Sequence, residues 1–285
     1  MENRESKVFV VTGGASGLGA ASAHRLGLRG IVLLCDIDSS GMARVAGEMR
    51  SEGMRVETID CDISDRHAVK SLAETAASLG RFAGLVNAAG LAAADGMSGN
   101  WRRIFEVNLV GTALLAQEFL PLAEPGSAAV CFASGAGHQP VDPKAEPILD
   151  APLSPDFIKT IEPFVAAHGF SGDINDALAE GAYTLSKRGV ISLCRRAAAA
   201  WGQRGARIIS LSPGLMDTPM AHREIKRNSR VFDIVLEVVP SHRMGTAYEA
   251  ANLVNFLLSE EASFISGTDI SIDGGYLAGM AYLGK

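Results

Sequence analysis

The twelve residues VFVVTGGASGLG, at positions 8–19, carry the strongest fold signal in this chain. The first five are β-branched or aromatic and predict a buried strand over residues 8–12, and a helix over residues 17–28 follows the glycine-rich turn. Glycines let the backbone turn tightly and approach a pyrophosphate, while the positive end of a helix dipole faces that anion. The stretch therefore predicts a phosphate-binding turn between a strand and a helix.

Short β-rich runs alternate with Ala- and Leu-rich helical stretches along the rest of the chain, which is typical of βαβ units. Six further strands are predicted over residues 31–35, 55–59, 84–87, 128–133, 207–211 and 269–272. Helices are predicted over residues 41–50, 64–79, 101–120, 183–201 and 248–258, with Ser64 as the N-cap of the second. We expect an α/β fold: a single Rossmann-type domain over residues 1–285, whose doubly wound, seven-stranded parallel sheet is flanked by helices.

Two segments break this rhythm. Residues 138–182 read as an ordered insertion, with short helices predicted over residues 156–167 and 174–180. The insertion holds six of the eleven prolines of the chain: Pro140, Pro143, Pro147, Pro152, Pro155 and Pro163. The second segment, residues 214–247, mixes charged and apolar residues between a strand and a helix, and we expect it to be a substrate loop.

Composition narrows the class of protein. Hydrophobic residues make up 47% and charged residues 20%, which is enough to fill a large core, and the net charge of −6 argues against nucleic acid as a partner. A charged start without a signal-peptide core, and no apolar run of about 18 residues, favour a cytoplasmic protein without a membrane partner. Four scattered cysteines (Cys35, Cys61, Cys131 and Cys194) read as reduced core residues, and neither they nor the six histidines have metal-ligand spacing, so no metal is expected.

Asp36 follows the second predicted strand, 17 positions after Gly19. A carboxylate there can accept both hydroxyls of an adenosine ribose and would repel a 2′-phosphate. No Lys or Arg occurs at positions 15, 16 or 37–40, where a cation could bind such a phosphate. The cofactor is therefore predicted to be NAD and not NADP; the alternative is that Asp36 caps the turn that follows it.

Tyr183 and Lys187 lie four positions apart on a predicted helix, so both side chains project from one face. A phenol with a pKa near 10 exchanges protons poorly at neutral pH, but a nearby cation stabilises the phenolate and lowers that pKa. Tyr183 is thus a candidate general base. A Tyr and a Lys at this spacing also occur on the exposed surfaces of many helices. The neighbouring motifs decide whether the pair is catalytic or merely a surface pair.

That context resembles the short-chain dehydrogenase/reductase family over nearly the entire chain apart from the insertion. The matching motifs occur in the order of the family: residues 12–19, Asp36, Asp62, residues 87–90, Asn108, Ser134, Tyr183 with Lys187, residues 213–214 with Thr218, and residues 273–275. The combination is far more specific than any single motif.

The resemblance implies a role for each matched catalytic position. Tyr183 would exchange a proton with the substrate oxygen, and Lys187 would hold the nicotinamide ribose and lower the pKa of Tyr183. Ser134 would hydrogen-bond the substrate oxygen, and Asn108 would hold a water that links Lys187 to solvent. Ser134 as a plain turn residue and Asn108 as a buried helix-bending amide are the alternatives.

The resemblance also implies a set of cofactor contacts. Asp62 would contact adenine, residues 87–90 would line the adenosine and ribose side, and Thr218 would bind the carboxamide; Asp62 as a solvated loop acid is the alternative. The full set of cofactor-binding residues is Gly13, Ser16, Gly17, Leu18, Gly19, Asp36, Ile37, Asp62, Ile63, Asn87, Ala88, Ala89, Gly90, Tyr183, Lys187, Pro213, Gly214 and Thr218.

The chain departs from the family where Tyr183 follows Ser134 by 49 positions, because the insertion lies between them. In this, and in the run over residues 197–205 with Trp201, it resembles the bacterial 3α-hydroxysteroid dehydrogenase/carbonyl reductase branch. The insertion borders two helices that members of the family often use for subunit contacts, and a homo-oligomer, dimer or tetramer, is expected. We expect Gln139, Pro140 and residues beyond them to form one wall of the substrate pocket. Met216 with the segment to residue 245 is expected to form the other wall and a lid.

These expectations together describe an NAD-dependent oxidoreductase that transfers a hydride between nicotinamide and a secondary alcohol or ketone. The substrate would be bulky and apolar, with a steroid-like molecule as one candidate. Two alternatives stay open: an NADPH-dependent 3-oxoacyl reductase, which Asp36 disfavours, and a catalytically silent NAD-binding regulatory protein, which an intact Ser134, Tyr183 and Lys187 disfavour.

Overall fold

The computed structural model describes residues 6–96, 99–227 and 235–283. Its main sheet has seven strands, all parallel, in the order β3-β2-β1-β4-β5-β6-β9. The strands are β1 (Lys7–Thr12), β2 (Ile31–Asp36), β3 (Val56–Asp60), β4 (Arg81–Asn87), β5 (Ala128–Phe132), β6 (Arg207–Pro213) and β9 (Asp269–Ile272). The predicted fold class, a doubly wound seven-stranded parallel sheet, is confirmed. The order reverses direction at β1, so a crevice lies between the ends of β1 and β4.

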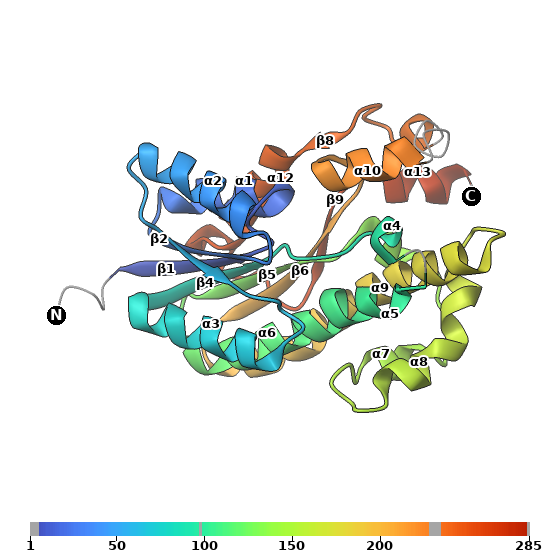
Figure 1. Ribbon diagram of the computed structural model, residues 1–285, viewed down its shortest axis with the longest axis horizontal. Coiled ribbons are helices and arrows are strands. Elements are labelled where there is room, and N and C mark those ends of the chain that lie inside the picture. The colour runs from blue at the N-terminus through green and yellow to red at the C-terminus, as the bar shows by residue number, and fades with distance from the viewer. Residues whose placement is uncertain (1–5, 97–98, 228–234, 284–285) are drawn as a thin grey trace.

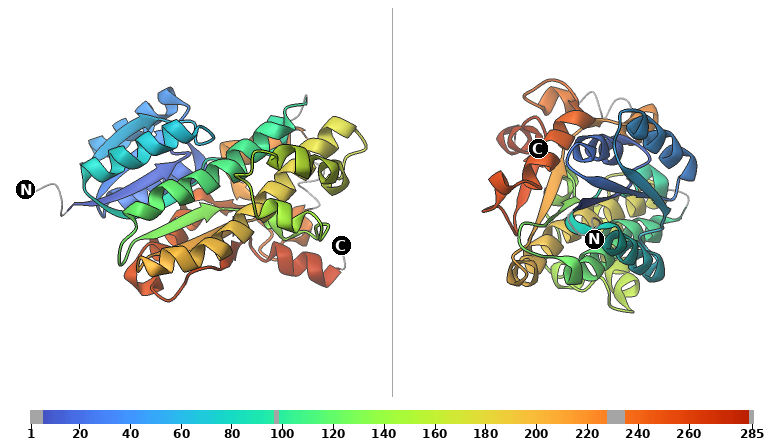
Figure 2. Two further views of the ribbon diagram at one scale, coloured as in Figure 1. Left: turned by 90° about the horizontal axis from the view of Figure 1, so that it is seen from below. Right: turned by 90° about the vertical axis from the view of Figure 1, so that its left-hand side faces the viewer.

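Helices cover both faces of this sheet (Figure 1). One face carries α1 (Gly17–Gly27), α2 (Ser39–Ser51) and α12 (Ala247–Leu257), and the other carries α3 (Arg66–Leu79), α6 (Thr112–Phe119) and α9 (Ile174–Gln203). The end-on view in Figure 2 shows the two helical layers with the twisted sheet between them. The chain therefore encloses two apolar cores, one on each side of the sheet.

Strand β1 shows why this sheet is doubly covered. Val8 and Val10 belong to the core beneath α3, α6 and α9, whereas Phe9 and Val11 belong to the core beneath α1, α2 and α12. All four side chains are fully buried. Because side chains alternate across a strand, a run that is apolar at every position needs helices on both faces.

The predicted helix over residues 101–120 is present, but it contains a wide turn. α5 (Trp101–Phe105) continues directly into a π-helical turn, η2 (Glu106–Gly111), and then into α6 and the short 3-10 turn η3 (Leu120–Leu122). π turns insert one extra residue into a helix and often occur at functional sites. Asn108, a predicted site residue, lies in this turn.

Two local predictions were wrong. Ser64 does not cap α3; Asp65 does, because its carboxylate accepts the amide of His67 at 2.8 Å, while the Ser64 hydroxyl donates to Asp62. The helices predicted over residues 174–180 and 183–201 form the single helix α9, which Asp173 caps by accepting from the amides of Asn175 and Asp176. The helix continues past Gly181 because another segment packs against that glycine.

The insertion is ordered and packs onto the core. It begins with the 3-10 turn η4 (Gly135–His138) and continues through α7 (Glu146–Leu149), α8 (Phe157–Val165) and the 3-10 turn η5 (Ala166–His168). Leu149, Phe157, Ile161 and Val165 are buried in the same core as α6 and α9. In Figure 1, α7 and α8 lie beyond the carboxyl ends of the strands, below the start of α9.

The segment over residues 214–247 contains elements that we did not predict. A two-stranded parallel ribbon of β7 (Met216–Asp217) and β8 (Gly245–Thr246) joins its two ends, and α10 (Pro219–Arg227) follows β7. Residues 228–234 of the predicted lid lie outside the described residues. Three further short helices are α4 (Ala93–Gly96), η6 (Glu260–Ala262) and α13 (Tyr276–Leu283). Within the described residues, no helix is both long enough and apolar enough to cross a bilayer.

We predict that Gly181→Ala destabilises the fold. A Cβ at position 181 would lie 1.8 Å from the carbonyl oxygen of Val165, so the insertion and α9 would have to separate. Overpacking of this kind costs about 1–3 kcal/mol or more of the free energy of unfolding, measured by urea denaturation.

Gly202→Ala is the matched control on the same helix. A Cβ at position 202 would meet no atom within 4 Å, so the higher helix propensity of Ala should stabilise by up to about 1 kcal/mol. Equal effects of the two substitutions on the urea midpoint would show that the contact at Gly181 is unimportant.

Candidate active site

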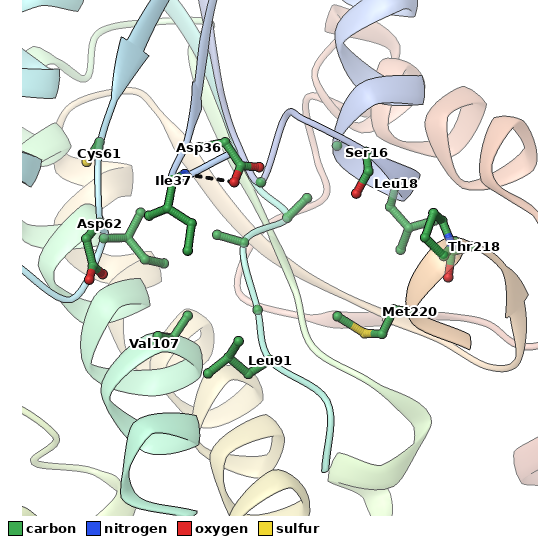
Figure 3. A pocket seen from close by; sticks show the side chains of 18 of the residues that line it. Ser16, Leu18, Asp36, Ile37, Cys61, Asp62, Leu91, Val107, Thr218 and Met220 are labelled. Carbon is green, nitrogen blue, oxygen red and sulfur yellow. Dashed lines mark hydrogen bonds between the residues drawn. The ribbon is translucent and has the colours of Figure 1, made fainter. Parts of the chain in front are cut away.

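Two adjoining cavities occupy the crevice at the carboxyl ends of the strands. The first, of about 260 Å³, runs from Asp36 and Asp62 at one end to Ser16 and Thr218 at the other (Figure 3). The second, of about 400 Å³, contains Tyr183. The two share Leu18, Ala88, Gly90, Leu91, Thr218 and Met220, so they form one continuous cleft.

The glycine turn after β1 lines the first cavity as predicted. Gly13 has a φ of 69°, and a Cβ there would lie 2.4 Å from the amide nitrogen of Ala89, so the two loops touch backbone to backbone. Gly17, Leu18 and Gly19 open α1 and line the cavity. Ser16, the N-cap of α1, makes no capping hydrogen bond with its side chain. The first turn of α1 thus presents amides and a hydroxyl to the cavity, a combination that fits a pyrophosphate.

Asp36 connects the end of β2 to this turn. One carboxylate oxygen accepts the amide of Ala15 at 3.0 Å, and the other accepts the amides of Ile37 and Asp38 at 2.7 and 3.1 Å. Asp36 therefore does cap the turn that follows it, as the alternative interpretation held, but it also lines the cavity beside Ile37 (Figure 3). The two roles are compatible because each carboxylate oxygen has two lone pairs.

Asp62 and Ile63 line the far end of the first cavity. Partial burial alone would raise the pKa of Asp62, but hydrogen bonds from Ser64 and from the guanidinium of Arg103 outweigh burial and lower it. Asp62 is thus an ion-paired carboxylate and not a solvated loop acid. Arg103, which we did not predict as a site residue, also lines the cavity.

Three residues after β4 line the cavity, whereas the last residue of β4 is buried in the protein interior. Ala88, Ala89 and Gly90 line the cavity, but the side chain of Asn87 is buried in the protein. It accepts a hydrogen bond from the Thr12 hydroxyl at 2.6 Å and donates one to the Thr112 hydroxyl at 2.8 Å. Asn87 therefore joins β1, β4 and α6 and supports the cavity from behind.

Tyr183, Lys187 and Ser134 come together in the second cavity. The hydroxyl of Ser134, at the start of η4, accepts the amide of Ala136 at 3.2 Å and is near enough to the Tyr183 hydroxyl to influence its pKa. The Lys187 ammonium donates to the carbonyl of Phe132 at 2.9 Å and lies 5.9 Å from the centre of the Tyr183 ring. A phenol, a hydroxyl and an ammonium thus converge from two separate segments.

Their pKa values differ from the sequence-based expectation. Burial raises the pKa of Tyr183, the hydrogen bond with Ser134 opposes this rise, and the negative charge of Glu224 adds to it. Burial also lowers the pKa of Lys187 to about 8. In the protein by itself, burial outweighs the hydrogen bond with Ser134, so the pKa of Tyr183 is raised and not lowered.

Asn108 is buried and fully hydrogen-bonded to protein groups. Its amide accepts from Leu91 N at 2.8 Å and donates to Leu91 O at 3.0 Å and to the Ser186 hydroxyl at 3.2 Å. The π turn thereby fastens the loop after β4 to α9. Asn108 also lies close to Lys187, since a Cβ at Gly90 would be 3.2 Å from Asn108 Oδ1 and 3.5 Å from Lys187 Nζ.

The segment over residues 214–247 borders the cleft with Thr218 and α10. Pro213, Gly214 and Met216 line the second cavity, and Thr218 lies over the start of α1, where a Cβ on Gly17 would be 3.6 Å from its own. Residues from Met216 into α10 thus line this cavity, and their role as a wall of a substrate pocket stays a prediction.

The other predicted wall, formed by Gln139, Pro140 and residues beyond, holds only for the later residues. Gln139 and Pro140 do not line the second cavity, and the preceding His138 pairs with Asp269 of β9 at 2.8 Å. The insertion contributes Phe170 to the cavity, and the first turns of α9 contribute Glu180. Glu180 precedes Tyr183 by three positions on a helix, a spacing that could have revealed it. No sequence signal pointed to Phe170.

The helix α10 also contacts the loop on the opposite side of the cleft. The carboxylate of Glu224 accepts the amide of Ala94 at 2.8 Å, and Arg223 lies 3.7 Å from Asp95. Figure 1 shows α10 and α4 at the same end of the molecule, beyond the strands. The cleft is therefore bridged, and Glu224 places a second carboxylate in the second cavity.

Known protein families match both halves of the chain. A model described as short chain dehydrogenase matches residues 7–145, and one described as enoyl-(acyl carrier protein) reductase matches residues 170–277. The stretch between the two matches lies within the insertion.

Individual proteins match over nearly the full length. The short-chain dehydrogenase/reductase bsc3 of Alternaria brassicicola is 34% identical over 96% of this chain and 97% of its own. The cis-4-hydroxycyclohexanecarboxylate dehydrogenase of Sinomonas cyclohexanicum is 30% identical over 95% of this chain and 97% of its own. A crystal structure of a single-residue variant of the actinorhodin polyketide ketoreductase with NADPH has the same fold, with a TM-score of 0.75 at 23% identity over 96% of this chain and 98% of that one.

The lowered pKa of Lys187 predicts how stability depends on pH. The folded pKa of about 8 lies below the ordinary 10.5, so the unfolded chain binds more protons between these values and stability rises with pH across that window. Across this pH window, the free energy of unfolding of wild type should rise by roughly 3 kcal/mol more than that of Lys187→Met, because each pKa unit corresponds to about 1.4 kcal/mol.

Urea denaturation at steps from about pH 7 to pH 10 measures this difference, and the subtraction of the variant removes the contribution of other titrating groups. Parallel stability curves for wild type and Lys187→Met would show that Lys187 titrates as an ordinary exposed lysine.

Proposed function

Because the chain belongs to the short-chain dehydrogenase/reductase family and is an oxidoreductase for alcohols or ketones, we propose that it uses NAD and acts on a bulky, apolar, uncharged secondary alcohol or the corresponding ketone. The observation that carries this proposal is the meeting of Ser134, Tyr183 and Lys187 in one cavity that continues into the cavity of the glycine turn. A dinucleotide bound along the first cavity would end beside these three groups.

The residues present fit a dinucleotide. The amides that open α1, with the Ser16 hydroxyl, would hold the pyrophosphate; Asp36 would accept the ribose hydroxyls, and Asp62 with Ile63 would flank the adenine. Thr218 and Lys187 would hold the nicotinamide half. The bound cofactor supplies the hydride donor or acceptor, and the protein supplies position and proton transfer.

Side chains of the protein would carry out the proton transfer. The Ser134 hydroxyl would hydrogen-bond the substrate oxygen, and the hydroxyl of Tyr183 would take the proton from an alcohol or return it to a ketone. Because burial raises the pKa of Tyr183, it needs positive charge nearby in order to act as a base. Lys187 supplies such a charge below its own pKa of about 8.

The lining of the second cavity favours an uncharged substrate. Its walls are mostly apolar and include Leu91, Leu215, Met216 and Met220. Two carboxylates, Glu180 and Glu224, also line it, while Lys187 is the single cation among the described lining residues. An anionic substrate would therefore meet like charge, whereas an apolar ring would find contact area. A steroid-like substrate, a homo-oligomeric state and a cytoplasmic location stay predictions.

Tyr183→Phe tests the proposed function. Removal of the proton-transfer hydroxyl should lower turnover by about 10²–10⁴-fold, while NADH affinity changes little because the ring and its packing stay. Turnover is followed by NADH absorbance over a panel of secondary alcohols that includes butan-2-ol, cyclohexanol, 2-decalol and a hydroxysteroid, and affinity by NADH fluorescence. Wild-type protein that binds NADH but turns over nothing in the panel would support the silent regulatory protein instead.

Asp36→Asn tests the cofactor. Wild type should bind NADH far more tightly than NADPH, because a carboxylate at about 4 Å repels a 2′-phosphate by roughly 4 kcal/mol at an effective dielectric constant of 20. Asparagine keeps an acceptor for the amides of Ile37 and Asp38 but removes the charge, so NADPH affinity should rise about tenfold or more.

Asp38→Asn is the matched control for this experiment. Asp38 is an exposed neighbouring carboxylate that caps α2, and asparagine caps helices equally well. Its substitution should leave the preference for NADH nearly unchanged. A wild-type preference for NADPH would overturn the NAD proposal and favour the 3-oxoacyl reductase.

A further inference from the structure

The last part of the insertion is held rigidly against the catalytic helix. A Cβ on Gly169 would lie 2.2 Å from the carbonyl oxygen of Ala177, and a Cβ on Gly181 would lie 1.8 Å from that of Val165. At both places the backbone of the insertion touches the backbone of α9 with no side chain between them. The segment over residues 165–171 therefore cannot slide along α9 without breaking these contacts.

Glu180 fixes the end of this segment. One oxygen of its carboxylate accepts the amides of Phe170 and Ser171 at 2.6 and 2.9 Å. Charge-assisted hydrogen bonds of this kind are among the stronger polar contacts in proteins. Because Glu180 lies three residues before Tyr183 on α9, the position of Phe170 is set relative to the proton-transfer tyrosine.

His168 ties the same segment to the first part of the insertion. Its Nε2 accepts the amide of Asp142 at 3.1 Å, so Nδ1 carries the proton and donates to the carbonyl of Phe164 at 2.7 Å. The first and last parts of the insertion are thus joined just before Phe170. These hydrogen bonds hold in place the turn that carries Phe170.

Within the described residues, the ring of Phe170 belongs to neither apolar core. The residue is 70% exposed, yet it lines the substrate cavity together with Ser134 and Tyr183. A buried aromatic ring contributes to a core, whereas an exposed one in a cavity contributes when a ligand covers it. The same cavity is lined by Met216 and Met220, whose flexible side chains can adapt to a ligand of irregular shape.

We propose that Phe170 is a specificity-determining residue, whose ring packs against an apolar ring of the substrate, and that Glu180 is a positioning residue that holds Phe170 at a set place relative to Tyr183. The inference rests on the proposed function. The insertion accordingly acts in recognition of the substrate as well as in the core.

The test compares a ring substrate with a small one. In Phe170→Ala, kcat/KM for oxidation of 2-decalol should fall about 10- to 100-fold, whereas kcat/KM for butan-2-ol and the affinity for NADH should stay within about twofold, since contacts to one apolar group typically discriminate by such factors. Phe264→Ala is the matched control, because Phe264 is fully exposed and lines neither cavity. It should leave the ratio of the two kcat/KM values unchanged.

Two substitutions at Glu180 distinguish a role in positioning Phe170 from general damage to α9. Glu180→Ala removes the acceptor for Phe170 N and Ser171 N and should lower the same ratio about tenfold, while Glu180→Gln retains an acceptor oxygen and should restore most of it. An equal loss for both alcohols in Glu180→Ala would overturn the positioning role.

The possible failures can be told apart. If wild type oxidises both alcohols in a Tyr183-dependent manner and Phe170→Ala leaves their ratio unchanged, the inference fails and the proposed function stands. If wild type oxidises neither alcohol and nothing else in the panel, the proposed function fails and the inference falls with it.

Discussion

The cleft depends on one close backbone contact, between Gly13 at the end of β1 and Ala88 and Ala89 after β4. This contact brings the two loops at the reversal of the sheet so near to each other that no side chain fits between them. Asp36 holds the same turn from the other side through the amide of Ala15, and Asn87 supports it from beneath through Thr12. The shape of the first cavity thus follows from hydrogen bonds and contacts within the protein, before any ligand binds.

Helix α9 holds together the other parts of the cleft. It carries Tyr183 and Lys187, receives the amide of Asn108 through Ser186, and supports the insertion at Gly181. The proposed proton-transfer residues, the loop after β4 and one wall of the second cavity are therefore all attached to one rigid element. This arrangement keeps the groups of the candidate site in place, because a displacement of any neighbour has to move a helix of 30 residues.

The fold class and the core of the site could be predicted because both rest on local patterns. Alternating apolar segments indicate parallel strands, and parallel strands bring residues 12–19, 87–90 and 134 to one edge. Features set by tertiary contact could not be predicted. Ser64 and Asp65 are equally good caps by sequence, Gly181 looks like a helix breaker until Val165 packs on it, and the side chain of Asn87 turns inward only because Thr12 and Thr112 face it. The raised pKa of Tyr183 likewise depends on burial, which no spacing encodes.

The π turn over Glu106–Gly111 holds one residue more than a regular α-helix would need. Deleting one of its six residues would let the chain continue as an α-helix, with the segments on either side keeping their faces toward the core. The change would fall instead on Asn108, whose amide bonds the loop after β4 and the Ser186 hydroxyl from within the wide turn. In this part of the chain a shorter sequence should therefore still fold, but with the edge of the cleft displaced.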